Sequence, residues 1–310
     1  VICDNGSSTT DFVFVDAAEK KGKAALETLP STYDVSKEAE QLVVHLRDKN
    51  EGFLLELVYS VFPKEDVITR SAKFINKSDK PVRLTRLMSM QLDLNRSGYV
   101  VTSFHGGWTK EMNRYDTTVN IGKFVNASYT GSSSNRCNPF IMVSEPDTSE
   151  TMGDCYGFNL VYSGNHYEAV EVNSFEKTRI VTGINPTNFA FLLAPGESFE
   201  SPEAVMTFSH EGFSGVSAHM HPFVREHVVR GSWQHKERPV LLNSWEASYF
   251  DISESSLLRL AKMGKDVGVE LFVMDDGWFG ERNNDTRALG DWTPNTKKLP
   301  NGVAGLCKKV

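Results

Sequence analysis

The sequence has little of what usually marks a specialised class of protein. Its 310 residues contain four cysteines, which form no Cys-x-x-Cys pair and no ladder of cysteine and histidine ligands. No apolar run approaches the roughly 20 residues that a membrane-spanning helix requires. The sequence also lacks HExxH, GxSxG and P-loop motifs. We therefore expect no membrane span, no bound metal and none of the enzyme classes that these motifs define.

Positive charge is also scarce. The formal net charge is −7, and the basic residues are scattered rather than gathered in a run. Because binding to nucleic acid depends on lysine and arginine that neutralise phosphates, this balance argues against a nucleic-acid partner. A neutral small molecule fits the composition better.

The cysteines bear on the cellular compartment. Cys137 and Cys155 could in principle form a bridge, but four cysteines at irregular spacing are more typical of free thiols in a reducing compartment. The chain opens at Val1 with no basic-then-apolar leader. We therefore expect a cytoplasmic protein. Because Val1 is not a methionine, we also expect residues upstream, where a targeting signal could lie.

Residues 1–210 are predicted to form a large antiparallel β-sandwich. Polar and apolar residues alternate along the chain, most regularly over 82–94, which places one face on a core and the other in water. Similar runs cover 54–62, 66–74, 168–181 and 189–193. Turn-forming residues separate them, and helical periodicity is almost absent. Over 211–237 the pattern becomes helical, which predicts a helical linker.

Residues 238–310 show a different order of elements. Short apolar runs at 240–242 and 269–274 are typical of buried strands, and the residues between them have the pattern of an amphipathic helix. Asp251 and Glu254 match a capping box at the start of that helix. Strand, helix and strand at this spacing predict two parallel strands. Since two parallel strands cannot close a barrel, we expect the first part of a (β/α)₈ barrel, incomplete here.

Candidate binding residues follow both predicted barrel strands. Asp275, Asp276 and Trp278 follow the second strand, and Trp245 follows the first. Ligands of parallel α/β folds bind at the carboxyl ends of the strands. Carboxylates accept from several hydroxyls and aromatic rings pack on C–H surfaces, so this combination suits a sugar. The alternatives are that the aspartates cap a helix or hold a cation, and that Trp245 plugs the barrel.

Two further groups in the sequence carry weaker signals. Trp108 follows Gly106 and Gly107, which permit a tight loop and close approach of a ligand or subunit. From these residues alone, a tryptophan buried in the sandwich is the favoured interpretation. His219 and His221 have H-x-H spacing, but on a helix their side chains point apart, so no metal site is predicted.

The chain resembles the family 36 glycoside hydrolases, the large bacterial-type α-galactosidases. The resemblance rests on runs of sequence that extend over nearly the whole chain: Arg136–Phe140, Leu160–Asn165, Gly183–Pro186, Pro195–Ala204, Pro239–Ala247, Glu270–Phe279, Leu289–Trp292 and Lys298–Pro300. It implies a β-supersandwich, a (β/α)₈ catalytic barrel and a C-terminal β-domain. It also implies retaining hydrolysis of terminal α-linked galactose from melibiose, raffinose and related sugars, without a metal or organic cofactor.

Residue by residue, the resemblance implies that Asp275 and Asp276 bind galactose hydroxyls and that Trp245 is a pocket aromatic. It also implies that Trp108 lies in a loop that reaches a neighbouring subunit's pocket in tetrameric members. Cys137 stands where relatives often carry histidine. The family's nucleophile lies in a Lys-Trp-Asp motif, which does not occur in these 310 residues.

We therefore expect the N-terminal portion of an α-galactosidase, with no catalytic carboxylate in this chain. Three alternatives stay open. Two are enzymes with a similar front half, an α-N-acetylgalactosaminidase and a galactosyl-transferring relative. The third is a non-catalytic carbohydrate-binding β-module. The residues that separate the enzymes lie mostly beyond Val310.

Overall fold

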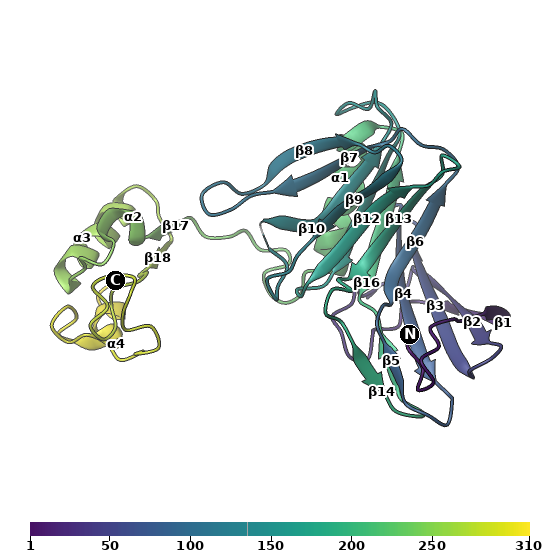
Figure 1. The fold of residues 1–310 in the computed structure, drawn as a ribbon. Helices are drawn as coiled ribbons and strands as arrows, with labels where there is room; N and C mark the ends of the chain where they lie inside the picture. The colour runs from purple at the N-terminus through teal and green to yellow at the C-terminus, as the bar shows by residue number, and fades with distance from the viewer. Residues whose placement is uncertain (135) are drawn as a thin grey trace. The chain divides into compact units, whose positions relative to one another are not determined.

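The computed structural model describes residues 1–134 and 136–310 and divides the chain into two compact units, Val1–Arg230 and Gly231–Val310. The first unit consists mostly of antiparallel strands, and the second combines short helices with a parallel strand pair (Figure 1). Among the residues that the structure describes, no helix has the length and apolar character to cross a membrane.

The largest sheet of the first unit runs through most of that unit. Its strands pair antiparallel wherever neighbours are hydrogen-bonded, and the sheet begins at an open edge formed by β1. In spatial order the strands are β1 (Phe12–Lys21), β2 (Glu40–Asp48), β3 (Phe53–Phe62), β4 (Val67–Asn76), β16 (Glu203–Ser209), β11 (Cys155–Val161), β10 (Cys137–Ser144), β7 (Val100–His105) and β8 (Asn113–Thr118), with β15 (Ser198–Glu200) also paired to β4.

A second layer packs on part of this sheet. Its core residues Met90, Val170 and Ile180 join Ile141 and Phe158 of the large sheet in one buried cluster, which is the interior of a sandwich. The strands of this layer are β12 (His166–Val172), β13 (Thr178–Ile184) and β6 (Met88–Leu94), with β9 (Gly122–Ala127) in contact with β12. A separate pair is formed by β5 (Val82–Leu84) and β14 (Phe191–Leu193).

Helix α1 (Gly212–His227) belongs to the first unit. Its apolar residues Phe213, Val216 and Phe223 pack with Phe62 and Val205 of the large sheet. The structure thus differs from the predicted arrangement, in which residues 211–237 form a linker. The apolar face that produces the helical periodicity covers a sheet, and the helix is therefore part of the first unit.

Two of the runs predicted to be single strands each contain two strands in the structure. The run 82–94 forms β5 and β6, which pair with different partners, β14 and β13. The run 168–181 contains a hairpin between β12 and β13, because the Asn173 side chain accepts from the backbone N–H groups of Phe175 and Lys177 and closes a turn. In the run 82–94, apolar residues continue at even positions on both sides of Arg86, so the pattern there does not reveal the break.

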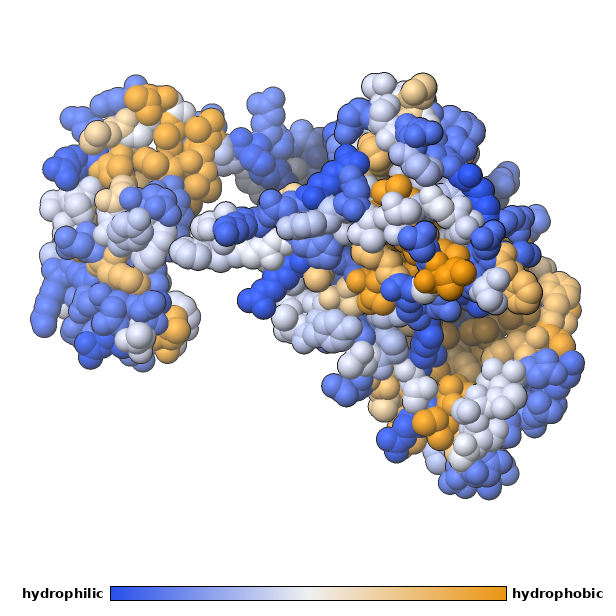
Figure 2. Space-filling model, turned by 45° about the horizontal axis from the view of Figure 1, so that its top comes forward, coloured by the Kyte–Doolittle hydropathy of each residue, from blue (hydrophilic) through white to orange (hydrophobic). Residues whose placement is uncertain are grey.

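The second unit confirms the predicted strand–helix–strand order. Strands β17 (Leu241–Asn243) and β18 (Leu271–Val273) pair in parallel. The helices are α2 (Trp245–Ser248), α3 (Glu254–Asp266) and α4 (Gly302–Cys307). Ile252, Leu257, Leu299 and Leu306 form the core of this unit. Both units present some apolar surface to solvent (Figure 2), and in the second unit Val240, Leu241 and Val267 are exposed.

The predicted cap of helix α3 is wrong. The N-cap is Ser253, whose extended backbone (φ −142°, ψ 159°) lets its Oγ accept from Ser256 N over 3.1 Å. In return, Ser253 N donates to Ser256 Oγ over 2.9 Å. Asp251 lies two residues before this cap, and its own N–H bonds to Ser248 O. The helix therefore begins two residues later than the Asp251–Glu254 pattern indicates.

Candidate functional site

The ends of β17 and β18 carry most of the candidate binding residues. Because the two strands are parallel, the residues that follow them lie at the same edge. Asn243 Nδ2 donates to Asp275 Oδ2 over 2.6 Å, and Asp275 N donates to Ser244 Oγ over 3.1 Å. The structure therefore brings together Asp275 and the segment that precedes Trp245, as the sequence predicts.

Asp276 is held by a buried arginine. Arg282, which is 5% exposed, donates from Nε to both carboxylate oxygens of Asp276 at 3.0 Å and from Nη2 to Oδ2 at 2.8 Å. Gly277 N donates to Asp276 Oδ1 over 2.7 Å. The hydrogen bonds from Arg282 are the main cause of the lowered pKa of Asp276, so this carboxylate stays ionised.

The two loops of the site are joined behind the aspartates. Lys298 Nζ donates to Phe250 O over 2.8 Å and to Gly277 O over 2.9 Å. Burial lowers the pKa of this amine. Gly277 has φ +89°, and a Cβ there would lie 3.1 Å from Phe250 Cα. A glycine at 277 is therefore required both for the backbone conformation and for close contact between the loops.

The aromatic residues of this edge have different roles. Trp245 is half-buried and meets Phe250 edge to face with ring centroids 5.0 Å apart. Trp278 packs against the hydrophobic core of the unit. Trp292 is 65% exposed, with its ring centroid 4.7 Å from that of Phe279. Trp245 and Trp292 thus retain accessible ring surface, whereas Trp278 contributes to the core.

Trp108 lies in the first unit, in the turn between β7 and β8, and is 89% exposed. The buried tryptophan favoured by the residues alone is therefore wrong. Gly107 and Lys110 exchange backbone hydrogen bonds of 3.2 and 3.0 Å, which tighten the turn. A Cβ at Gly106 would lie 2.2 Å from Lys110 O. A tight turn at these two glycines presents the indole to solvent.

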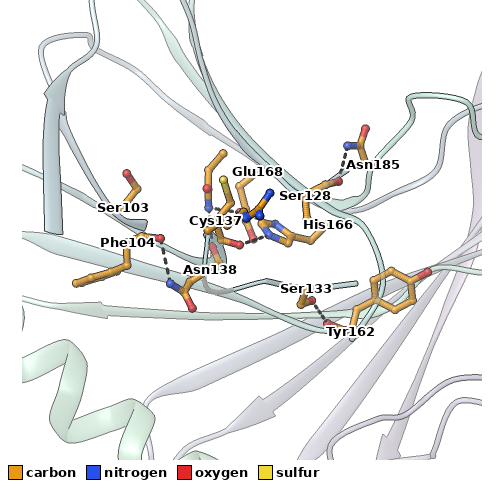
Figure 3. A network of polar contacts seen from close by, with 12 residues as sticks. Ser103, Phe104, Ser128, Ser133, Cys137, Asn138, Tyr162, His166, Glu168 and Asn185 are labelled. Atoms are coloured by element: carbon orange, nitrogen blue, oxygen red, sulfur yellow. Dashed lines mark hydrogen bonds and ion pairs between the residues drawn. The ribbon is translucent and has the colours of Figure 1, made fainter. Parts of the chain in front are cut away.

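A buried polar network lies at the base of this hairpin (Figure 3). His166 and Glu168 are both fully buried, and His166 Nδ1 lies 3.1 Å from Glu168 Oε2. His166 Nε2 donates to Cys137 O over 2.7 Å, and Asn126 Nδ2 donates to Glu168 Oε2 over 2.7 Å. Cys137 Sγ in turn lies 3.5 Å from Nδ1 of His105, the last residue of β7. The network thus connects the second layer to the strand that leads to Trp108.

The remaining sequence predictions concern metal and sulfur. All four cysteines are free, so Cys137 and Cys155 form no disulfide. His219 Nδ1 lies 2.8 Å from Thr207 Oγ1, and His221 is exposed. Among residues 1–134 and 136–310, no group of three histidine, cysteine or carboxylate side chains is placed to hold a metal ion.

Sequence reasoning missed Arg282 and Lys298 as site residues. Arg282 lies in an irregular loop six residues after Asp276, where periodicity gives no position for a side chain. Lys298 follows Asn295, whose side chain accepts from the backbone of both 297 and 298. A cation near a carboxylate pair is the signal that could have drawn attention to Arg282.

The structure thus combines an antiparallel sandwich with a parallel βαβ unit that carries carboxylates and aromatic residues at its strand ends. Residues 1–194 match the model for the glycosyl hydrolase family 36 N-terminal domain, and residues 198–310 match the melibiase model. The chain belongs to glycoside hydrolase family 36. The predicted family and fold class are therefore confirmed.

Several relatives support this assignment. Alpha-galactosidase AgaA of Geobacillus stearothermophilus is 42% identical over 308 residues, which are 99% of this chain and 42% of that protein. Probable alpha-galactosidase G of Aspergillus terreus is 40% identical over 93% of this chain and 40% of its own length. The chain thus spans about two fifths of the length of these relatives.

Solved structures agree with the sequence comparison. The crystal structure of the Geobacillus enzyme matches with a TM-score of 0.96 at 42% identity, covering 99% of this chain and 43% of that one. The α-galactosidase of Lactobacillus brevis matches with a TM-score of 0.95 at 40% identity, covering 99% and 42%. A variant of the Geobacillus enzyme in complex with raffinose matches with a TM-score of 0.95 at 42% identity, covering 99% and 43%.

Proposed function

We propose that this chain is the N-terminal part of a retaining α-galactosidase, and that its second unit supplies part of the galactose pocket. The observation that carries the proposal is the placement of Asp275 and Asp276 at the end of β18, beside Asn243 and Trp245 at the end of β17. Its support comes from relatives that are α-galactosidases, one of which, the Geobacillus enzyme, has been solved as variants in complex with raffinose and with stachyose.

The four proposed substrate-binding residues divide between the two units. Asp275 and Asp276 accept hydrogen bonds from galactose hydroxyls, and Trp245 packs on the apolar face of the sugar. Trp108, exposed on its hairpin, contacts the pocket of a neighbouring subunit. Galactose-containing oligosaccharides of the melibiose and raffinose type are the substrates.

Neither aspartate is assigned to bond cleavage. Retaining hydrolysis requires a nucleophilic carboxylate and an acid/base carboxyl about 5–5.5 Å apart on either side of the scissile bond. Asp275 and Asp276 are instead committed to Asn243 and Arg282. Because the chain contains no Lys-Trp-Asp segment, we assign both catalytic carboxylates to sequence outside these 310 residues.

We also propose that the full-length protein is a cytoplasmic homotetramer. The four free thiols fit a reducing compartment, in which structural disulfides are rare. The exposed apolar residues Trp108, Met112 and Tyr115 on one hairpin fit an interface with another copy. Cell fractionation tests the compartment, and light scattering of the full-length protein tests the assembly.

The deciding experiment begins with the reading frame beyond Val310. A Lys-Trp-Asp segment downstream supports the proposal, and a stop codon there contradicts it and favours a sugar-binding module. The full-length product should hydrolyse an aryl α-galactoside, whereas the 310-residue chain should not. Preference for the aryl α-N-acetylgalactosaminide, or for galactosyl transfer over hydrolysis, would identify one of the alternative enzymes. Turnover by the 310-residue chain would contradict the assignment of the catalytic carboxylates.

A further inference from the structure

The buried guanidinium of Arg282 contacts both halves of the candidate pocket. It donates three hydrogen bonds to the carboxylate of Asp276, and its Cζ lies 5.3 Å from the centroid of the Phe250 ring. Phe250 in turn meets Trp245 edge to face. A fourth hydrogen bond, from Nη1 to Arg287 O over 2.8 Å, fixes the guanidinium to its own loop. One side chain thus links the acidic residues and the aromatic residues of the site.

The hydrogen bonds to Asp276 leave it little freedom. Its Oδ1 accepts from Gly277 N and Arg282 Nε, and its Oδ2 accepts from Arg282 Nε and Nη2. Because the Nε–H is shared between the two oxygens, three N–H groups occupy the four lone-pair sites of the carboxylate, which leaves capacity for one further donor. Because the planar fork of arginine fixes the carboxylate in two directions, the remaining acceptor has a defined orientation.

A second carboxylate, that of Asp275, lies beside the contact between Arg282 and Asp276. Asp275 and Asp276 are adjacent, and Asp276 N donates to Asp275 Oδ1 over 2.7 Å. The hydrogen bonds and charge of Arg282 lower the pKa of Asp276 and so keep this carboxylate an ionised acceptor beside Asp275.

We propose that Arg282 is a positioning residue of the galactose site: it orients Asp276 and keeps it an ionised acceptor beside Asp275. This inference rests on the proposed function but adds a residue to it. Arg282 is 5% exposed, so its guanidinium offers little surface to a sugar, and its observed hydrogen bonds go to Asp276 and Arg287. Its effect on substrate therefore passes through Asp276.

The first test is independent of any sugar. Carboxyl ¹³C NMR of the 310-residue chain follows the titration of Asp276 in the wild type, in Arg282→Gln and in a matched control, Arg287→Gln. Arg287 is an exposed arginine in the same loop. Loss of the opposite charge should raise the pKa of Asp276 in Arg282→Gln, with no change in Arg287→Gln. An unchanged titration in Arg282→Gln overturns the inference.

The second test uses the kinetics of the full-length protein that we propose. In Arg282→Gln the acid limb of kcat/KM should move to higher pH, with a loss of kcat/KM on the order of 100-fold at the low-pH end of the profile. Arg282→Ala should recover activity when guanidinium ions are added, whereas a purely structural defect would not respond. Arg282→Lys keeps the charge but not the fork, so its acid limb should stay near that of the wild type while its KM rises.

A double-mutant cycle shows whether the effect passes through Asp276. If it does, the double variant Arg282→Gln with Asp276→Asn should lose no more kcat/KM than Asp276→Asn alone. Additive losses, or a loss in Arg282→Gln that is equal at every pH, overturn the inference while the proposed function stands. If the wild type shows no α-galactosidase activity, the proposed function and the sugar-binding role both fall, and the NMR titration reports the Arg282–Asp276 coupling alone.

Discussion

Asn243 and Asp275, which are 32 residues apart in sequence, are joined by a 2.6 Å hydrogen bond between the ends of two parallel strands. Asn243 Oδ1 also accepts from Trp245 N over 2.8 Å. One amide therefore orients the carboxylate from β18 and the backbone that carries the aromatic residue after β17. The positions of Asp275 and Trp245 at this strand edge therefore depend on each other through Asn243.

This contact predicts that Asn243→Ala weakens galactose binding without unfolding the second unit. Asn243 is exposed, so its loss leaves no buried polar group without a partner. The expected effect is about 1–2 kcal/mol, because a hydrogen bond to a charged group is lost. KM of the full-length enzyme for an aryl α-galactoside measures it. Asn283→Ala, an exposed asparagine of the same unit, is the control. Equal KM values for the two variants would remove Asn243 from the site.

The cap of helix α3 gives a prediction about stability. Ser253→Ala should lower the free energy of unfolding of the second unit by about 1 kcal/mol, because the free N–H of Ser256 loses its acceptor. Asp251→Ala, at the position that the sequence pattern favours, should change it by less than about 0.5 kcal/mol. Urea unfolding of both variants decides between the two positions. A larger loss in Asp251→Ala would contradict the observed cap.

The contrast between Asp251 and Ser253 shows what local pattern can and cannot establish. Asp-x-x-Glu and Ser-x-x-Ser both satisfy a capping motif, and they overlap here by two residues. The choice is made by the backbone, since Ser253 is the residue with extended φ and ψ. The presence of the helix and of both flanking strands was predictable, because apolar periodicity determines them.

The candidate site was predictable to the same degree. The positions of Asp275 and Trp245 follow from parallel strands, whose carboxyl ends share an edge. The contact from Arg282 does not follow, because the path of an irregular loop depends on tertiary contacts such as those of Lys298. The exposure of Trp108 was also unpredictable from residue type, because a tryptophan in a β-domain is more often buried. The turn at Gly106 and Gly107 determines its position.

The buried pair His166–Glu168 predicts a pH dependence in the first unit. Burial opposes the charged imidazolium, but the hydrogen bond and charge of Glu168 outweigh burial and raise the pKa of His166. Burial also raises the pKa of Glu168. A raised folded-state pKa stabilises the fold below the unfolded value, which is about 6.5 for histidine, and this stability is lost as pH rises through the folded-state pKa. The first unit should therefore be less stable at pH 9 than at pH 6.

Glu168→Gln tests this prediction. The variant should be less stable than the wild type at pH 6, and its stability should change less between pH 6 and pH 9, because the partner charge of His166 is gone. Thermal unfolding at the two pH values measures both effects. Glu171→Gln is the matched control, since Glu171 lies on the same strand in an exposed ion pair with Lys123 and should cost less than about 1 kcal/mol. An identical pH dependence in Glu168→Gln would contradict this account.

The exposed indole of Trp108 predicts a separation between stability and assembly. Because the residue is 89% exposed, Trp108→Ala should leave the unfolding free energy of the 310-residue chain within about 0.5 kcal/mol of the wild type. In the full-length protein the same change should weaken the tetramer and raise KM, since the indole is proposed to contact a neighbouring subunit's pocket. Light scattering and steady-state kinetics measure the two effects.

Phe175→Ala is the control, because Phe175 is also strongly exposed (81%) and lies in the β12–β13 turn. This variant should alter neither the assembly nor KM. A loss of unfolding free energy with unchanged assembly would mean that Trp108 supports the fold of its own subunit instead.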